Sequence, residues 1–317
     1  MPLSYNMNMS RPVVVQPPRL RRPQRMQVVT RCVKGGRSAI VRDTVKWYGW
    51  TAVYNIYNKN ALEDLDVGFV TAAQLAFSTF MTFSCKITTS SIRPPTNGRI
   101  MYLAMLIMLS LGQYFGNHFG NVATRLMSIS SVNIIKSSEP ILTMGVMFLL
   151  FQQRQSMYKI ALVIPIIGGI CLCNMTDIAY NHTGALMCVV SNMFHIFKIV
   201  ASKKYFVEVL GYPGEALYIL SNLGSFIIGV PILLQNYTGM THRAAFNLLM
   251  SAFGYYYNSV TAFDLITKVN PVTFSMLNIY KRIVITGVCY VLSMKLPTIM
   301  AVTGMAISNA ALYLYMK

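Results

Sequence analysis

Three basic side chains lie where the sequence is otherwise apolar enough to cross a membrane. Lys281 and Arg282 are adjacent within residues 271–293, and Lys136 lies in a comparable stretch of the other half. A basic side chain at bilayer depth costs about 2.5–3.5 kcal/mol on insertion scales, so such residues usually face a polar cavity and serve a function. Arginine grips two phosphoryl oxygens with its planar fork, and lysine adds a compact charge. These residue types predict a binding site for a phosphorylated anion.

Positive charge is in excess at membrane depth. Two acids at that depth, Glu139 and Asp264, face six basic residues: Lys59, Lys86, Lys136, Lys198, Lys281 and Arg282. The two lysines nearest to predicted span ends can reach the lipid headgroups instead. Glu139 follows Lys136 by one helical turn and is expected to pair with it. That pairing would leave Lys281 and Arg282 without a carboxylate, so an anion from solution is the expected partner.

Polar side chains recur at helical spacing around these cations. Asn133 lies one turn before Lys136, and Asn117 shares a helix face with Gly120. Close helix packing is the usual role of such a glycine. The aromatic run 255–257 either stacks on a substrate or fills the bundle, and Tyr257 is the residue that we expect to meet substrate. A histidine one turn before Lys198, His195, is expected to be packed or exposed to water.

The composition is that of a polytopic all-α membrane protein. The chain has 317 residues, of which 54% are hydrophobic and only 11% charged, whereas a soluble domain carries about a quarter charged residues. The apolar residues form long runs of helix-spanning length. The sequence contains no Gly-rich phosphate loop, no His/Cys metal spacing and no paired acids. We therefore expect no enzyme activity, catalytic residues, metal site or cofactor.

Turn signals and charges divide the chain into ten predicted spans. They run near residues 46–61, 67–90, 99–122, 128–151, 158–174, 182–203, 213–234, 243–264, 271–293 and 297–316. With the N-terminus inside, 18 Lys and Arg residues fall inside and three outside. This positive-inside bias holds only for an even number of spans.

Residues 1–45 form a separate basic arm before residues 46–317, which hold the predicted spans. With Lys46, which follows it directly, the arm holds ten of the 27 Lys and Arg residues, and it is rich in proline. Its position favours a topogenic or targeting segment, expected to be flexible, over a nucleic-acid-binding one. No nucleic-acid partner is expected.

The two halves of the chain, about 46–174 and 182–316, resemble each other. In each half a span with the basic residues precedes a helix of small residues, 160–173 in the first and 301–315 in the second. Five spans per half make the two repeats inverted in the membrane. Inverted repeats place the substrate site near the midplane, between the halves.

Several sequence motifs resemble those of a known family over residues 46–316. The motifs are NIYNK (55–59), GNHFGNV (116–122), SSVNIIKSSEP (130–140), SKK (202–204) and NPVTFSMLNIYKR (270–282). In this order they resemble the plastid phosphate translocators of the triose-phosphate/phosphate type, within the drug/metabolite transporter superfamily. The Lys281-Arg282 dipeptide is the most specific element, because nucleotide-sugar carriers generally have another residue after the lysine.

The resemblance implies roles for particular residues. Lys136, Lys281 and Arg282 correspond to the family's phosphate-gripping residues, and Lys198 falls where the family has an arginine. Other positions depart from the family pattern, so the contacts to the rest of the substrate are expected to differ. They are Asn117 (for histidine, with His118 next to it), Gly120 (for a hydroxyl residue), Asn133 (for histidine) and Asn258 (for tyrosine, beside Tyr257).

The function implied by the resemblance is strict exchange of inorganic phosphate for a phosphorylated C3, C5 or C6 metabolite, such as triose phosphate, 3-phosphoglycerate or phosphoenolpyruvate. Alternating access around the basic site would carry it out. The alternative is a nucleotide-sugar/nucleoside-monophosphate antiporter of the endomembrane system.

We expect a multi-pass protein located in a plastid or plastid-derived membrane, with the Golgi or endoplasmic reticulum membrane as the alternative. Besides substrates, the expected partner is membrane lipid. The number of subunits is left open, with a homodimer as one arrangement.

Overall fold

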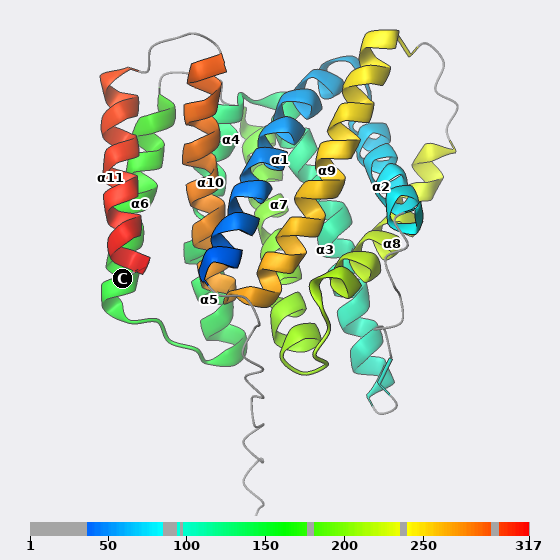
Figure 1. Ribbon diagram of the computed structural model, residues 1–317, viewed down its shortest axis with the longest axis horizontal. Coiled ribbons are helices and arrows are strands. Elements are labelled where there is room, and N and C mark those ends of the chain that lie inside the picture. Colours follow the sequence, from blue (N-terminus) through cyan, green and yellow to red (C-terminus); the bar gives the residue numbers. More distant parts are fainter. Residues whose placement is uncertain are drawn as a thin grey trace, which may run out of the picture. The chain divides into compact units, whose positions relative to one another are not determined.

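The computed structural model describes residues 37–84, 94–95, 98–175, 181–234, 240–292 and 298–316, and residues 32–317 form one compact unit. Every regular element in these ranges is a helix (Figure 1). Most of the predicted basic arm, together with Lys86, lies outside the described residues. An all-α fold is therefore confirmed for the part of the chain that the structure describes.

The helices follow the predicted spans closely. They are α1 (Arg37–Asp64), α2 (Val67–Ser84), α3 (Arg99–Leu126), α4 (Ile129–Lys136), α5 (Glu139–Phe151), α6 (Met157–Asn174), α7 (His182–Ala201), the π-helix η3 (Ser202–Val207), α8 (Gly214–Leu233), α9 (His242–Lys268), α10 (Pro271–Leu292) and α11 (Ile299–Met316). The predicted span 128–151 is not one helix but two, α4 and α5.

Six helical segments of the described chain are long and apolar enough to span a membrane. They are Val67–Ser84, Arg99–Leu126, Ile129–Phe151, Met157–Asn174, His182–Val207 and Gly214–Leu233. Large apolar side chains such as Ile100, Leu149 and Ile164 are exposed on these segments, as expected for a surface that faces lipid. The protein is an all-α membrane protein.

A proline causes the interruption between α4 and α5. Pro140 lies in the first turn of α5, and its ring cannot follow a continuous helix because it would meet the carbonyl of Lys136, four residues earlier. The carbonyls freed at the end of α4 accept hydrogen bonds from the hydroxyls of Ser137 and Ser138, at 2.5 and 2.8 Å. The break therefore separates Lys136, the last residue of α4, from Glu139, the first of α5.

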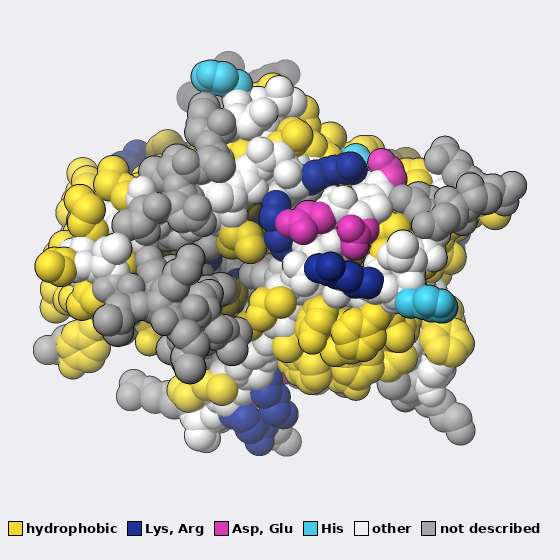
Figure 2. All heavy atoms as spheres, turned by 90° about the horizontal axis from the view of Figure 1, so that it is seen from above, with side chains coloured by type: hydrophobic (Ala, Val, Ile, Leu, Met, Phe, Trp, Pro, Cys, Tyr) yellow, Lys and Arg dark blue, Asp and Glu magenta, His cyan; other side chains and the backbone are white. Residues whose placement is uncertain are grey.

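The helices pack in a small number of pairs. The closest are α1 with α9, α3 with α7, α2 with α8, and α6 with α11, while α10 packs against α1 and α5. Figure 1 shows α6 and α11 together at one side of the bundle. We call the end of the bundle where α1 and α10 begin and α9 ends the Asp43 face, and the opposite end, where α1 ends, the Glu63 face. Figure 2 looks onto the Glu63 face, where acidic and basic side chains gather together.

Two glycines bring α6 and α11 into direct backbone contact. A β-carbon on Gly169 would overlap the carbonyl of Gly304 and the side chain of Ser308, and one on Gly304 would overlap the carbonyl of Gly169. The Ser308 hydroxyl donates to the carbonyl of Ile166 at 2.9 Å. Small residues at helix interfaces allow this approach in membranes, where packing rather than hydrophobicity drives association.

We predict that Gly169→Val lowers the stability of the protein by about 1–3 kcal/mol, because the added carbons must push the two backbones apart. Gly168→Val is the matched control, since nothing lies within 4 Å of a β-carbon at Gly168. Thermal unfolding in detergent measures both variants. Equal unfolding midpoints for the two would contradict the proposed close contact.

Candidate functional site

A cavity of about 200 Å³ lies in the middle of the bundle, lined by residues of α1, α3, α4, α5, α7, α9 and α10. The structure brings together eight of the residues singled out from the sequence: Lys136, Lys198, Lys281, Arg282, Asn117, Gly120, Asn133 and Asn258. Glu139 also lines this cavity. The four cations come from α4, α7 and α10, which are separated widely along the chain.

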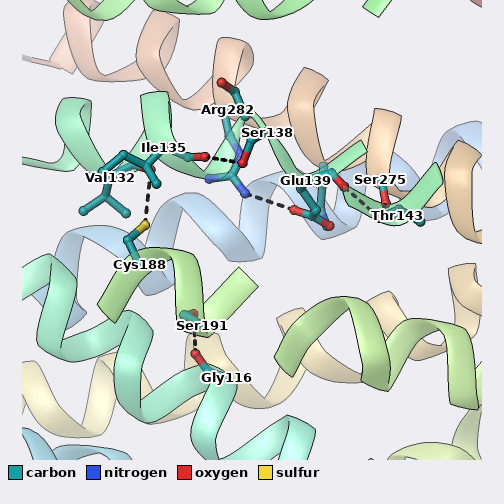
Figure 3. A network of polar contacts seen from close by, with 12 residues as sticks. Gly116, Val132, Ile135, Ser138, Glu139, Thr143, Cys188, Ser191, Ser275 and Arg282 are labelled. Atoms are coloured by element: carbon teal, nitrogen blue, oxygen red, sulfur yellow. Dashed lines mark hydrogen bonds and ion pairs between the residues drawn. The ribbon is translucent and has the colours of Figure 1, made fainter. Parts of the chain in front are cut away.

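Glu139 pairs with Arg282 rather than with Lys136, so the expected pairing is wrong. Its carboxylate lies 3.3 Å from Arg282 Nη2 and accepts a hydrogen bond from Asn278 Nδ2 at 2.8 Å. Figure 3 shows Arg282 reaching toward Glu139. The helix break explains the difference: Lys136 and Glu139 belong to separate helices, and the first turn of α5 faces α10. A carboxylate at a helix N-terminus is also favoured by the helix dipole.

The Lys136 ammonium lies so close to Gly120 that a side chain at that position would crowd it. A β-carbon at Gly120 would lie 3.2 Å from Lys136 Nζ and 3.1 Å from Ser191 Oγ. Among the described residues, Lys136 makes no hydrogen bond or ion pair. The glycine that replaces the family's hydroxyl residue thus leaves room for this lysine, whose charge is available to a ligand.

The other two lysines contact neutral groups. Lys198 Nζ donates to Gln113 Oε1 at 2.8 Å and lies 5.6 Å from the ring centroid of Phe263. Lys281 Nζ lies 4.0 Å from the ring centroid of Trp47. Such cation–π contacts offset part of the cost of removing an ammonium from water. Neither contact neutralises the charge.

The cavity is strongly positive. Four cations and one carboxylate line it. The second acid predicted at this depth, Asp264, is instead paired with Lys268 at 2.5 Å and has a side chain that is 44% exposed. Lys59 is outside the lining as well, and donates to the carbonyl of Thr124 at 2.9 Å. Charge repulsion inside a site that excludes much of the solvent favours the binding of an anion.

Neutral side chains on α3 and α9 form a wall of the cavity beside the cations. The hydroxyl of Tyr255 accepts hydrogen bonds from Gln113 and from Asn117. On the same wall the amide of Asn121 accepts from Asn58 at 3.0 Å and from Tyr54 at 3.3 Å. Of these, the sequence analysis missed Gln113, Asn58 and Tyr54, and within the run 255–257 it preferred Tyr257 to Tyr255. For Gln113 the spacing was the available signal, because Gln113, Asn117 and Asn121 follow each other at four-residue steps on one face of α3.

Two predicted residues do not line the cavity. Tyr257 stacks on Trp50 with ring centroids 4.5 Å apart. His118 lies parallel to the ring of Tyr114 at 5.9 Å. Asn258 does line it, with its Oδ1 accepting from the Thr51 hydroxyl at 2.6 Å. His195, expected to be packed or exposed, lines the cavity against α3, where a β-carbon at Gly116 would lie 2.9 Å from its Nδ1.

Buried aromatic rings line the cavity on the side of the Asp43 face, and an ion cluster lies nearer that face. Trp47 and Phe274, both buried, stack with centroids 5.0 Å apart. Toward the surface, Lys268 bridges Asp43 at 2.7 Å and Asp264 at 2.5 Å. Burial alone would raise the pKa of Asp43, but the hydrogen bond and charge of Lys268 outweigh it and hold that pKa below its ordinary value. Both partners are therefore charged at neutral pH, and the cluster ties α1 to α9.

Comparison with known proteins places the chain in a family. A sequence profile of the Triose-phosphate Transporter family matches residues 40–316. Phosphoenolpyruvate/phosphate translocator 3, chloroplastic, of Oryza sativa subsp. japonica is 28% identical over 293 residues, covering 86% of this chain and 73% of the relative. The non-green plastid triose phosphate/phosphate translocator of Brassica oleracea var. botrytis is 25% identical over 288 residues, covering 86% and 71%.

A more distant relative and a solved structure extend the comparison. Putative transporter C83.11 of Schizosaccharomyces pombe is 22% identical over 289 residues, covering 85% of this chain and 64% of the relative. A crystal structure superposes with a TM-score of 0.68 at 12% identity, covering 88% of this chain and 96% of the other, which shows a shared fold.

The protein is an all-α membrane protein of a transporter family. The chain belongs to the Triose-phosphate Transporter family, because the profile matches most of its length. The resemblance drawn from the sequence motifs is thereby confirmed.

We predict that Glu139→Gln destabilises the protein by about 3 kcal/mol, because Arg282 then lies at the cavity wall without a carboxylate. Glu208→Gln is the control, since Glu208 directly follows η3, pairs with Lys204 four residues earlier, and has a side chain that is 27% exposed, so its loss should cost less than about 1 kcal/mol. Chemical unfolding in detergent without added anions measures both. A Glu139 variant as stable as the control would refute the structural importance of this pair.

Proposed function

We propose that the chain is an antiporter that exchanges inorganic phosphate for a phosphorylated metabolite, with phosphorylated three-carbon compounds as the first candidates. The observation that carries this proposal is the cavity lined by four cations and a single carboxylate. A phosphoryl dianion supplies the missing negative charge, and arginine and lysine are the residues best suited to bind it. The names of the plant relatives, which are phosphate translocators of chloroplasts, support both this substrate class and a plastid-type membrane.

In this proposal the cations and the neutral wall have different tasks. Lys136, Lys281 and Arg282 hold the phosphoryl group. The rest of the substrate contacts residues that line the cavity beside them: Lys198, Asn117, Gly120, Asn133 and Asn258. The roles assigned to His118 and Tyr257 stay predictions, since both contact other aromatic rings in this conformation.

Ten membrane spans in two inverted repeats are part of the same proposal. The helix pairs support it, because most of them recur when the two halves are exchanged: α1 with α9 becomes α7 with α3, and α2 with α9 becomes α8 with α3. Pairs between corresponding helices, α2 with α8 and α6 with α11, map onto themselves. This is the pattern expected of repeats related by a pseudo-two-fold axis.

The charge of the cavity also explains why uptake of one anion is coupled to release of another. Closing both ends of the cavity over an empty site would bury cations without partners, which is costly. A bound anion removes that cost, so the loaded carrier changes its orientation and the empty carrier does not. Exchange, rather than one-way transport, follows from this without any further device.

The proposal is tested with labelled phosphate and proteoliposomes that contain the purified protein. Vesicles preloaded with phosphate, phosphoenolpyruvate or 3-phosphoglycerate should take up label, and vesicles that contain neither phosphate nor a phosphate ester should take up almost none. Preloading with nucleoside monophosphate, against external nucleotide sugars, tests the endomembrane alternative. Equal uptake into empty and preloaded vesicles would refute obligatory exchange.

We predict that Lys281→Ala and Arg282→Ala each abolish exchange, since each removes a charge from the phosphoryl site. Arg282→Lys separates charge from geometry: it keeps a cation for Glu139 but loses the planar fork, so exchange should fall steeply while the protein stays folded. Lys159→Ala, a change at an exposed lysine outside the cavity, is the control. Wild-type exchange rates in either alanine variant would remove that residue from the site.

A further inference from the structure

The charge of Lys281 is compensated by an aromatic ring, that of Trp47. Lys281 Nζ lies 4.0 Å from the indole centroid, and in the described part of the chain this lysine has no hydrogen bond and no ion pair. The negative face of the ring is therefore the closest compensation for its charge while no anion is present. The indole N–H is buried without a hydrogen-bond partner among the described residues, so packing alone holds the ring.

Trp47 also takes part in the contacts that join the start of α1 to α10. Its ring stacks on Phe274 of α10, and the hydroxyl of its neighbour Tyr48 donates to the Leu277 carbonyl of α10 at 2.9 Å. Lys281 therefore has two partners: in the empty cavity it contacts Trp47 of α1, and in the proposed function it binds the phosphoryl group of the substrate.

We propose that Trp47 is a positioning residue that holds the Lys281 ammonium while the cavity is empty, and that a phosphoryl group draws the ammonium away from it. A full negative charge attracts an ammonium more strongly than a ring quadrupole does. Loading then removes one of the links between α1 and α10, the contact of Lys281 with Trp47. This inference rests on the proposed function, because it takes phosphate as the anion that competes with the ring.

The chain offers a matched pair of fluorescent reporters for this step. It contains two tryptophans: Trp47 lines the cavity, whereas Trp50 is outside the lining and stacks on Tyr257. In a Trp50→Phe variant, added phosphate should change the emission of Trp47 and saturate with the same midpoint as phosphate binding measured by calorimetry. In a Trp47→Phe variant the emission of Trp50 should not change. Adding Lys281→Gln to the Trp50→Phe variant should abolish the response.

A second measurement tests whether the Trp47 ring competes with phosphate for Lys281 or only fills space. Incorporating fluorinated tryptophan into the Trp50→Phe variant weakens the negative face of the Trp47 ring with little change in its shape. Because the competitor for Lys281 becomes weaker, phosphate binding measured by calorimetry should tighten by roughly two- to fivefold. A ring that serves only to fill space predicts unchanged or weaker binding.

The outcomes distinguish this inference from the function on which it rests. If calorimetry detects phosphate binding but the Trp47 emission does not respond, or fluorination fails to tighten binding, the role of Trp47 is wrong and the phosphate site stands. If calorimetry detects no phosphate binding to the wild-type protein, the proposed function and the role of Trp47 are both wrong.

Discussion

One ion pair, between Glu139 and Arg282, sets the charge of the whole cavity. It is the one ion pair of the described chain that uses cavity-lining residues on both sides. Burying two charges together contributes little net stability, but a lone buried cation is much worse. The pair therefore makes Arg282 tolerable in the empty protein and leaves the three lysines without a carboxylate. A cavity with one more acid would be more stable and would attract anions less.

The chemistry of the cavity is divided between its walls. The cations stand on α4, α7 and α10, whereas α3 and α9 contribute neutral amides and a tyrosine that hydrogen-bond to one another. A charge-based grip tolerates shifts in position, but a hydrogen-bonded wall selects by geometry. Substitutions in the neutral wall can therefore alter which molecule fits while the grip on its charged group is kept. The departures from the family pattern at Asn117 and Asn258 lie on that wall.

Position along a helix was predictable from the sequence, whereas rotation about the helix axis often was not. The spans, and the convergence of Lys136 with Lys281, follow from apolar run lengths and from the cost of charge in lipid. In the run 255–257, however, all three residues are tyrosines, so periodicity does not say which one faces inward; the structure turns Tyr255 to the cavity and Tyr257 away. Glu139 was misassigned for a related reason, since helical spacing no longer applies across a proline break.

The distribution of apolar character among the helices bears on how the chain enters its membrane. Among the helices described over their whole length, α1 and α9 are not among the six apolar segments, and each contributes polar side chains to the cavity. Segments of this kind partition poorly into lipid as single helices. Helix α9 packs against α2 and α8, which are among the apolar segments, and α1 packs against α9. We therefore expect cooperative insertion, in which the polar helices become stable in the bilayer through the partners that shield them.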